Sequence, residues 1–265
     1  MENKLDTLFD HLWQDYIAIT PSAHKIHALL GEYGEIINDH IALRTFNLEK
    51  VNLEKISAHF LALGYEEKGQ YHFEQKKLSA KHFEHPESTR PKVFISELLV
   101  EQFSPELQAL VKSMVEQIDE SAVTQAGFVH SGTHWQVSGE QYDALLAESE
   151  YAAWMSAWGF RANHFTVSVN HLNGLEELTD VNEMLKTAGF TLNTSGGEIK
   201  GGADVFLAQS STMADKAAVP FSDAERTIPS CFYEFAQRYV LPGGALYQGF
   251  VAASADKIFE STNAK

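Results

Sequence analysis

Two short stretches of similar pattern decide the fold that we expect, Asp39-His40-Ile41-Ala42-Leu43-Arg44-Thr45-Phe46 and Asn163-His164-Phe165-Thr166-Val167-Ser168-Val169-Asn170. Each places a histidine directly after an aspartate or asparagine and then continues with the apolar and β-branched residues that favour a strand. The second stretch alternates apolar and polar residues, which predicts a half-buried strand. Its polar face would carry His164, Thr166, Ser168 and Asn170.

The segments that follow the two stretches also match. A predicted helix over residues 53–63 ends at Gly64, 24 residues after His40, and one over residues 175–188 ends at Gly189, 25 residues after His164. Each unit closes with a strand after a proline, Pro91-Lys92-Val93-Phe94-Ile95-Ser96-Glu97-Leu98 and Pro229-Ser230-Cys231-Phe232-Tyr233-Glu234-Phe235-Ala236. Aligning Phe94 with Phe232 places Ser96 opposite Glu234. A repeat of this kind predicts two structural modules of the same type.

The fold class that follows is α+β, with two βαβββ-type modules forming a cupped mixed sheet. We place the modules at about residues 36–100 and 161–240 of one domain over 1–265, joined by a helical insertion at about 101–160. Helical spacing also predicts a helical N-terminal segment from Asp6 to Gly31, broken near Thr20-Pro21. The turn Leu241-Pro242-Gly243-Gly244 could bring the C-terminal segment, 241–265, over the pocket.

Three residues of the repeat have the chemistry of metal ligands. Alternate residues of a strand share a face, so packing the modules side by side would bring His40, His164 and Glu234 together. Two imidazoles and one carboxylate with open positions are typical of non-haem Fe(II) oxygenases, and Zn(II), Mn(II) or Ni(II) could use the same ligands. The alternative is a structural role for each residue, with Glu234 in a buried salt bridge with Arg238.

Two arginines each follow a proposed ligand by four residues on the same strand face. Arg44 follows His40 and Arg238 follows Glu234, roughly 13 Å along an extended strand. The guanidinium fork suits a carboxylate, so either could hold the far end of an anionic substrate. The alternative for each is a structural ion pair.

Other candidates are weaker. His82 and His85 fit loop residues better than ligands, and His130 and His134 would support the site from outside at most. The single cysteine, Cys231, cannot form an internal disulfide, rules out a cysteine-built zinc site and is expected to pack in the core.

The charge balance limits the partners. The 20 basic and 36 acidic residues give a formal net charge of −16, which argues against a general nucleic-acid binder and against anionic membrane surfaces. The N-terminus lacks the apolar run of a secretory signal, and no run approaches the ~20 apolar residues that span a bilayer. We therefore predict a cytoplasmic protein.

The quoted motifs, together with Ala253-Ser254-Ala255-Asp256-Lys257-Ile258-Phe259-Glu260-Ser261, resemble the 2-oxoadipate dioxygenase/decarboxylase family, a former domain-of-unknown-function family with a vicinal oxygen chelate-like fold. The resemblance implies metal ligation by His40, His164 and Glu234 and substrate binding by Arg44; Arg238 is our extension from strand geometry. It also implies Fe(II) as the cofactor and O2 and a 2-oxo acid as the substrates. For 2-oxoadipate the products would be 2-hydroxyglutarate and CO2, a step of lysine breakdown.

Two other hypotheses fit the same cup. One is a metal-dependent hydrolase or isomerase that needs no O2, and the other is a non-catalytic module that binds an organic acid. The 2-oxoadipate substrate of the dioxygenase hypothesis is a dianion, which the overall negative charge of the protein would repel. Its recognition would therefore depend on the metal and on Arg44, with or without Arg238.

Overall fold

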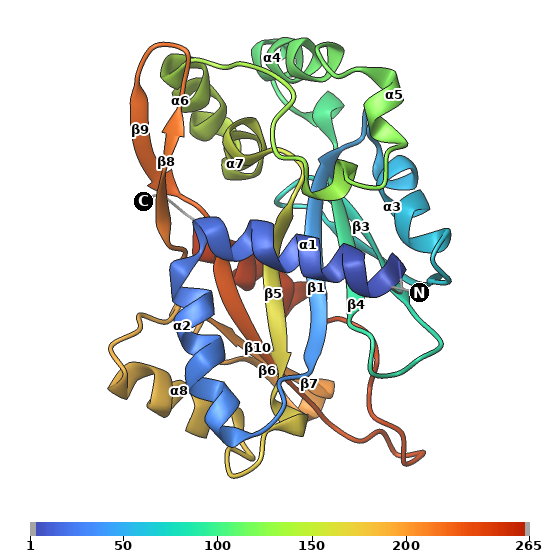
Figure 1. The fold of residues 1–265 in the computed structure, drawn as a ribbon, viewed down its shortest axis with the longest axis vertical. Helices are drawn as coiled ribbons and strands as arrows, with labels where there is room; N and C mark the ends of the chain where they lie inside the picture. The colour runs from blue at the N-terminus through green and yellow to red at the C-terminus, as the bar shows by residue number, and fades with distance from the viewer. Residues whose placement is uncertain (1–3, 263–265) are drawn as a thin grey trace.

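An eight-stranded mixed sheet forms the centre of the molecule in this computed structural model, which describes residues 4–262 (Figure 1). Its strands in chain order are β1 (Asn38–Phe46), β2 (Glu66–Phe73), β3 (Leu78–Glu84), β4 (Lys92–Leu98), β5 (Ala162–Ser168), β6 (Lys200–Gly202), β7 (Leu207–Ser211) and β10 (Phe232–Arg238). Across the sheet they follow the order β2-β3-β4-β1-β5-β10-β7-β6. The two predicted histidine strands, β1 and β5, therefore lie side by side at the centre.

The two halves of the sheet have the same topology. β1 and β5 pair antiparallel, each pairs in parallel with the closing strand of its own unit, and the outer strands continue antiparallel. The α+β fold with two βαβββ-type modules is thus confirmed. The second module carries an addition that the sequence pattern did not predict, a separate hairpin of β8 (Lys216–Pro220) and β9 (Glu225–Pro229) inserted before β10.

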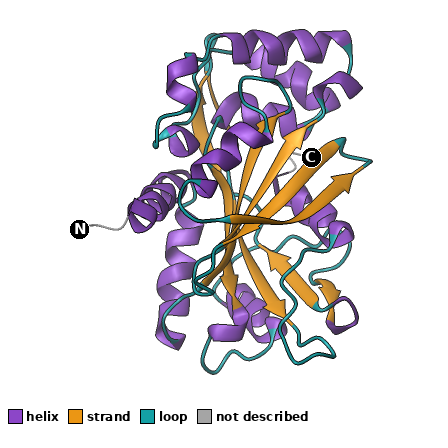
Figure 2. Ribbon diagram, turned by 90° about the vertical axis from the view of Figure 1, so that its right-hand side faces the viewer, coloured by secondary structure: helices purple, strands orange, loops and turns teal. Residues whose placement is uncertain are grey.

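Helices cover both faces of the curled sheet (Figure 2). The helices are α1 (Lys4–Ile19), α2 (Pro21–Leu30), α3 (Leu53–Leu61), α4 (Pro105–Glu116), α5 (Glu120–Val123), α6 (Gly139–Glu148), α7 (Glu150–Trp158), α8 (Leu178–Thr187) and α9 (Ala252–Ile258). On the outer face, the α1 residues Trp13 and Tyr16 each pack 5.0 Å from the ring of Phe165. α9 and the 3-10 turn Phe259–Thr262 lie against the inner, cupped face, where Thr262 reaches Arg44.

Three predictions for the second module need correction, two on β5 and one on the helix that follows it. β5 is buried along its whole length and not half-buried, because α1 covers its apolar face and the cup encloses its polar face. The strand ends at Ser168, so Asn170 lies in a 3-10 turn and not on the strand face. The helix predicted from residue 175 starts at Leu178, where Glu177 and Asp180 form a capping box.

The alignment of the two closing strands is wrong by two residues. Pairing of β1 with β5 sets His40 opposite Thr166 and Ala42 opposite His164. Each histidine thus lies opposite the residue two positions after the other, so the two occupy equivalent positions in their modules. Phe94 is the β4 partner of Ala42, and Glu234 is the β10 partner of Thr166. Phe94, not Ser96, is therefore the counterpart of Glu234, and the first module supplies an aromatic ring where the second supplies a carboxylate.

Candidate metal centre

The three predicted ligands come together on the inner face of the sheet. They stand on the neighbouring strands β1, β5 and β10, and one ligand atom of each lies within 4.8 Å of the others. His40 Nε2 is 3.6 Å from Glu234 Oε1, and His164 Nε2 is 3.1 Å from Glu234 Oε2. All three side chains are buried. The antiparallel register of β1 and β5 produces this convergence, because it places the two histidines one strand apart with their rings 5.6 Å apart.

Both imidazoles are oriented by the residue that precedes them. His40 Nδ1 lies 2.8 Å from an Asp39 carboxylate oxygen, and His164 Nδ1 lies 3.1 Å from the Asn163 amide oxygen. A carboxylate only accepts hydrogen bonds, so Nδ1 of His40 carries the proton and its Nε2 presents a lone pair toward Glu234. The Asn163 amide oxygen can accept from Nδ1 of His164 in the same tautomer, which leaves Nε2, now 3.1 Å from Glu234 Oε2, for a metal. This is the arrangement of imidazoles that bind a metal through Nε2.

The electrostatics of the cluster fit a cation. Burial is the largest influence on the Glu234 carboxyl and favours its neutral form, but the two imidazoles and a hydrogen bond from Gln209 outweigh it and keep its pKa below the ordinary value. Burial lowers the pKa of His164, and the neighbouring Glu234 carboxylate opposes that shift. The buried centre thus gathers a carboxylate and imidazole lone pairs, and a divalent cation among them would satisfy all three.

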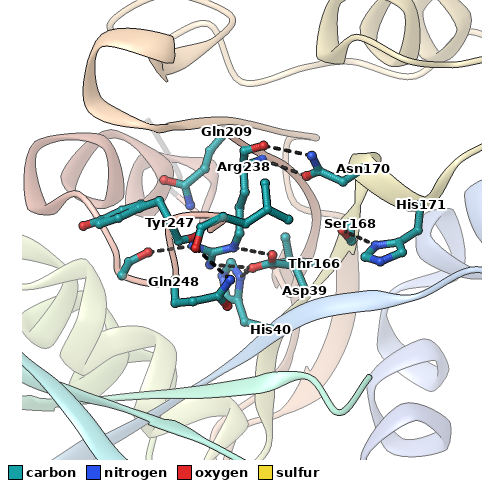
Figure 3. Close-up of polar contacts among 12 residues, drawn as sticks. Asp39, His40, Thr166, Ser168, Asn170, His171, Gln209, Arg238, Tyr247 and Gln248 are labelled. Atoms are coloured by element: carbon teal, nitrogen blue, oxygen red, sulfur yellow. Dashed lines mark hydrogen bonds and ion pairs between the residues drawn. The ribbon is translucent and has the colours of Figure 1, made fainter. Parts of the chain in front are cut away.

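Two polar side chains that the sequence pattern did not single out complete the centre. Gln209 Nε2 donates to Glu234 Oε1 at 2.6 Å. The Thr166 hydroxyl lies 3.1 Å from His40 Nε2, and Figure 3 labels these two residues together with Gln209. The Gln209 amide oxygen is buried and has no hydrogen-bond partner among residues 4–262. Thr166 was predicted only as a member of the polar face. Gln209 lies on β7, and no motif indicates it.

Arg44 lies at the end of the cup that α7 closes. Its guanidinium carbon is 4.8 Å from the centre of the Tyr151 ring and 4.9 Å from that of Trp154, so aromatic side chains hold its plane. Nη1 is 3.3 Å from a carboxylate oxygen of Glu150, and Nη2 donates to Thr262 at 3.2 Å. Nε is buried without a hydrogen-bond partner in the described chain. An unpaired buried donor of this kind is costly, and substrate binding by Arg44 stays a prediction.

Arg238 has a different environment from the one its strand position suggests. Its Nε and Nη2 pair with both carboxylate oxygens of Asp39 at 2.6 and 2.8 Å, and its Nη1 donates to the carbonyls of Tyr247 and Gly249 (Figure 3). The predicted alternative of an ion pair with Glu234 is wrong, because Asp39 takes up the guanidinium fork. Burial alone would raise the pKa of Asp39, but Arg238 and His40 hold it well below the usual range. A substrate contact of Arg238 stays a prediction.

The C-terminal segment lies over the centre, as the turn after β10 predicts. The Phe250 ring is 4.8 Å from the His40 ring and 5.0 Å from that of Phe94, and its backbone N–H donates to Tyr71 Oη. Phe250 is buried. The segment thus shields the inner face of the sheet from water.

The weaker candidates fall outside the centre. His82 is not a loop residue: it is buried on β3, where Nδ1 contacts Tyr71 and Nε2 contacts Glu84. His130 lies 5.2 Å from the His11 ring of α1. Cys231 packs in the core as predicted, and burial raises the pKa of its thiol to about 12.

Comparison with known proteins identifies relatives of this chain. The family model for 2-oxoadipate dioxygenase/decarboxylase matches residues 4–248. A rice protein (Oryza sativa subsp. japonica) named 2-oxoadipate dioxygenase/decarboxylase, chloroplastic/amyloplastic, is 32% identical over 291 residues, 97% of this chain and 78% of the relative.

Solved structures show the same architecture. A putative hydrolase from Shewanella frigidimarina is 60% identical with a TM-score of 0.92, over 96% of this chain and 100% of that one. The hydroxyglutarate synthase of Oryza sativa, in complex with 2-oxoadipate, is 31% identical with a TM-score of 0.91, over 99% of this chain and 94% of that one. By sequence and by fold, this chain belongs to the 2-oxoadipate dioxygenase/decarboxylase family.

Proposed function

We propose that this protein is a non-haem Fe(II)-dependent dioxygenase/decarboxylase that converts 2-oxoadipate and O2 to 2-hydroxyglutarate and CO2, a step of lysine breakdown. The observation that carries the proposal is the buried convergence of His40, His164 and Glu234 in a chain of this family. Three protein ligands on one side of a metal leave positions for a chelating 2-oxo acid and for O2. In the first module the position equivalent to Glu234 is held by Phe94, which cannot bind a metal, and this is consistent with such open positions.

His40, His164 and Glu234 would hold the metal. When bound, Fe(II) supplies Lewis-acid polarisation of the 2-oxo group and the electrons that O2 activation requires. The protein supplies the orientation of the ligands through Asp39 and Asn163. Phe250 and the C-terminal segment keep water away from the reacting carbon.

Arg44 would bind the distal carboxylate of the substrate. Its stacked guanidinium is pre-organised, and its free Nε donor gives a carboxylate a partner inside an apolar wall. Such a local cation answers the difficulty raised by the net charge of −16, because a dianion must be attracted by the site and not by the whole molecule.

No helix within residues 4–262 combines the length and the apolar character that a bilayer crossing demands. A cytoplasmic location stays a prediction. Iron also stays a proposal, since Zn(II), Mn(II) and Ni(II) suit the same donors.

The test is an oxygen-electrode assay of Fe(II)-loaded protein with a series of 2-oxo acids, combined with measurement of CO2 and of the product. We expect equal amounts of O2 consumed and CO2 released with 2-oxoadipate, and loss of both in His164→Ala. Unchanged turnover in His164→Ala would contradict the assignment of the site.

A second arm of the experiment addresses the O2-independent alternative. The Shewanella relative with 60% identity is described as a putative hydrolase, so turnover must also be measured without O2. Anaerobic turnover would favour a hydrolase or isomerase. Thermal stabilisation by 2-oxoadipate without turnover would favour a binding module.

A further inference from the structure

The two imidazoles of the centre have unequal supporting partners, although they occupy equivalent positions of the repeat. The β1–β5 register makes His40 equivalent to His164, and hence Asp39 equivalent to Asn163. One ring therefore has a carboxylate beside its Nδ1 and the other has an amide oxygen there. Because both side chains orient the imidazole in the same way, the difference between Asp39 and Asn163 separates the effect of charge on each histidine from the effect of orientation.

A second pair of equivalent positions matches this difference. Counting from the strand partners of the two histidines, Lys92 and Phe232, places Leu98 at the end of β4 in the position that Arg238 takes at the end of β10. Arg238 pairs bidentately with Asp39, whereas Leu98 is apolar and fully buried. The first histidine thus has a charged support that is paired with an arginine, whereas the second has a neutral amide, and a leucine holds the position equivalent to that arginine.

The ion pair is positioned by further contacts. The backbone N–H of Arg238 donates to the Asn170 side chain, and the Asn170 amide donates back to the Arg238 carbonyl, both at 2.8 Å (Figure 3). Nη1 of Arg238 is held by two carbonyls of the 247–249 segment. Asp39 and Arg238 are both buried, so the carboxylate stays in register with His40.

From this geometry we propose that Asp39 and Arg238 are positioning residues that make His40 the stronger imidazole donor to the metal, while Asn163 sets only the orientation of His164. A carboxylate on the remote nitrogen draws the proton away from the ring and increases the donor strength of the other nitrogen. Arg238 fixes the carboxylate through two hydrogen bonds, one to each oxygen. The inference rests on the metal site proposed above.

The test is metal binding by the intact protein, without turnover. Co(II) and Zn(II) dissociation constants would be measured by chelator competition for the parent, for Asp39→Asn and for Asp39→Asn combined with Arg238→Met. The double variant removes both charges and places neutral side chains at both positions, as Asn163 and Leu98 do at the equivalent positions, so no buried guanidinium loses its partner. Asp143→Asn is the matched control, because Asp143 forms an exposed ion pair with Arg226 of the remote hairpin, at 2.8 Å.

We expect Asp39→Asn and the double variant to bind either metal about ten- to a hundredfold more weakly than the parent. We expect Asp143→Asn to stay within about twofold of it. The visible absorption bands of the fully Co(II)-loaded protein should also shift in Asp39→Asn, which a merely structural role of Asp39 would not produce.

Two results would overturn the inference and are distinguishable. If the parent binds metal, loses it in His164→Ala, and Asp39→Asn and the double variant keep both the parent affinity and the parent spectrum, the positioning role alone fails. If the parent binds neither metal, the proposed site fails and this inference fails with it.

Discussion

Replacing Glu234 with glutamine should separate metal binding from folding. The carboxylate is 1% exposed, and within residues 4–262 no lysine or arginine forms an ion pair with it. Glutamine has the same shape and can still accept the hydrogen bond from Gln209, which is 2.6 Å long in the parent. The substitution thus removes a negative metal ligand with little change in packing.

The expected magnitude follows from linkage. A metal present at a hundred times its dissociation constant stabilises the parent by about 2.7 kcal/mol. For a domain of this size 1 kcal/mol corresponds to about 2–4 °C, so the metal should raise the parent's Tm by about 5–11 °C. The Gln variant should show little or none of this shift. Without metal its unfolding free energy should fall only modestly below that of the parent, because the glutamine loses the attraction between the carboxylate and the imidazoles but keeps the packing and the hydrogen bond from Gln209.

The assay is thermal unfolding of parent and variant, each with chelator and with excess Co(II) or Zn(II), alongside O2 consumption with Fe(II). A Gln variant that keeps the parent's metal-dependent shift would refute the role of Glu234 as a ligand. A variant that is much less stable than the parent in chelator would show that the carboxylate serves mainly folding, which would contradict the expectation that the substitution changes packing little.

Three further predictions concern groups elsewhere in the cup and core. Arg44→Lys should raise KM for 2-oxoadipate by about ten- to a hundredfold with a smaller change in kcat, since lysine keeps the charge but loses the fork; steady-state kinetics with an unchanged KM would contradict substrate binding by Arg44. The Cys231 thiol, with a pKa raised to about 12 by burial, should not react with a thiol reagent at pH 8 until denaturant unfolds the protein, and rapid labelling of the native protein would be inconsistent with its packing. Burial lowers the pKa of Lys200 from 10.5 to about 8, so between these values the unfolded chain binds more protons and the stability of the parent rises with pH. Lys200→Met should therefore gain most over the parent below pH 8 and lose that gain by about pH 10.5, and urea titrations showing a pH-independent difference would argue against a strained buried ammonium.

Much of the centre could be predicted from local pattern. A strand repeats every two residues, so the alternation around His164 and the match with His40 indicate two histidines on equivalent faces. Glu234 follows from its place on the closing strand of the second unit. The helix boundaries at Pro21 and Pro105, and the glycines at 64 and 189 with positive φ, also follow from properties of single residues.

The remaining features depend on contacts between distant segments. Arg238 and Asp39 are 199 positions apart, and Gln209 and Glu234 come from different strands, so no local period reveals that they pair. The strand register likewise decided that Phe94, not Ser96, is the counterpart of Glu234, because a shift of two residues leaves the alternation of faces unchanged. The sequence by itself thus determined which side chains face the cup. Only the tertiary structure decided which of them touch, since burial forces each charge and hydrogen-bonding group to find a partner across the fold.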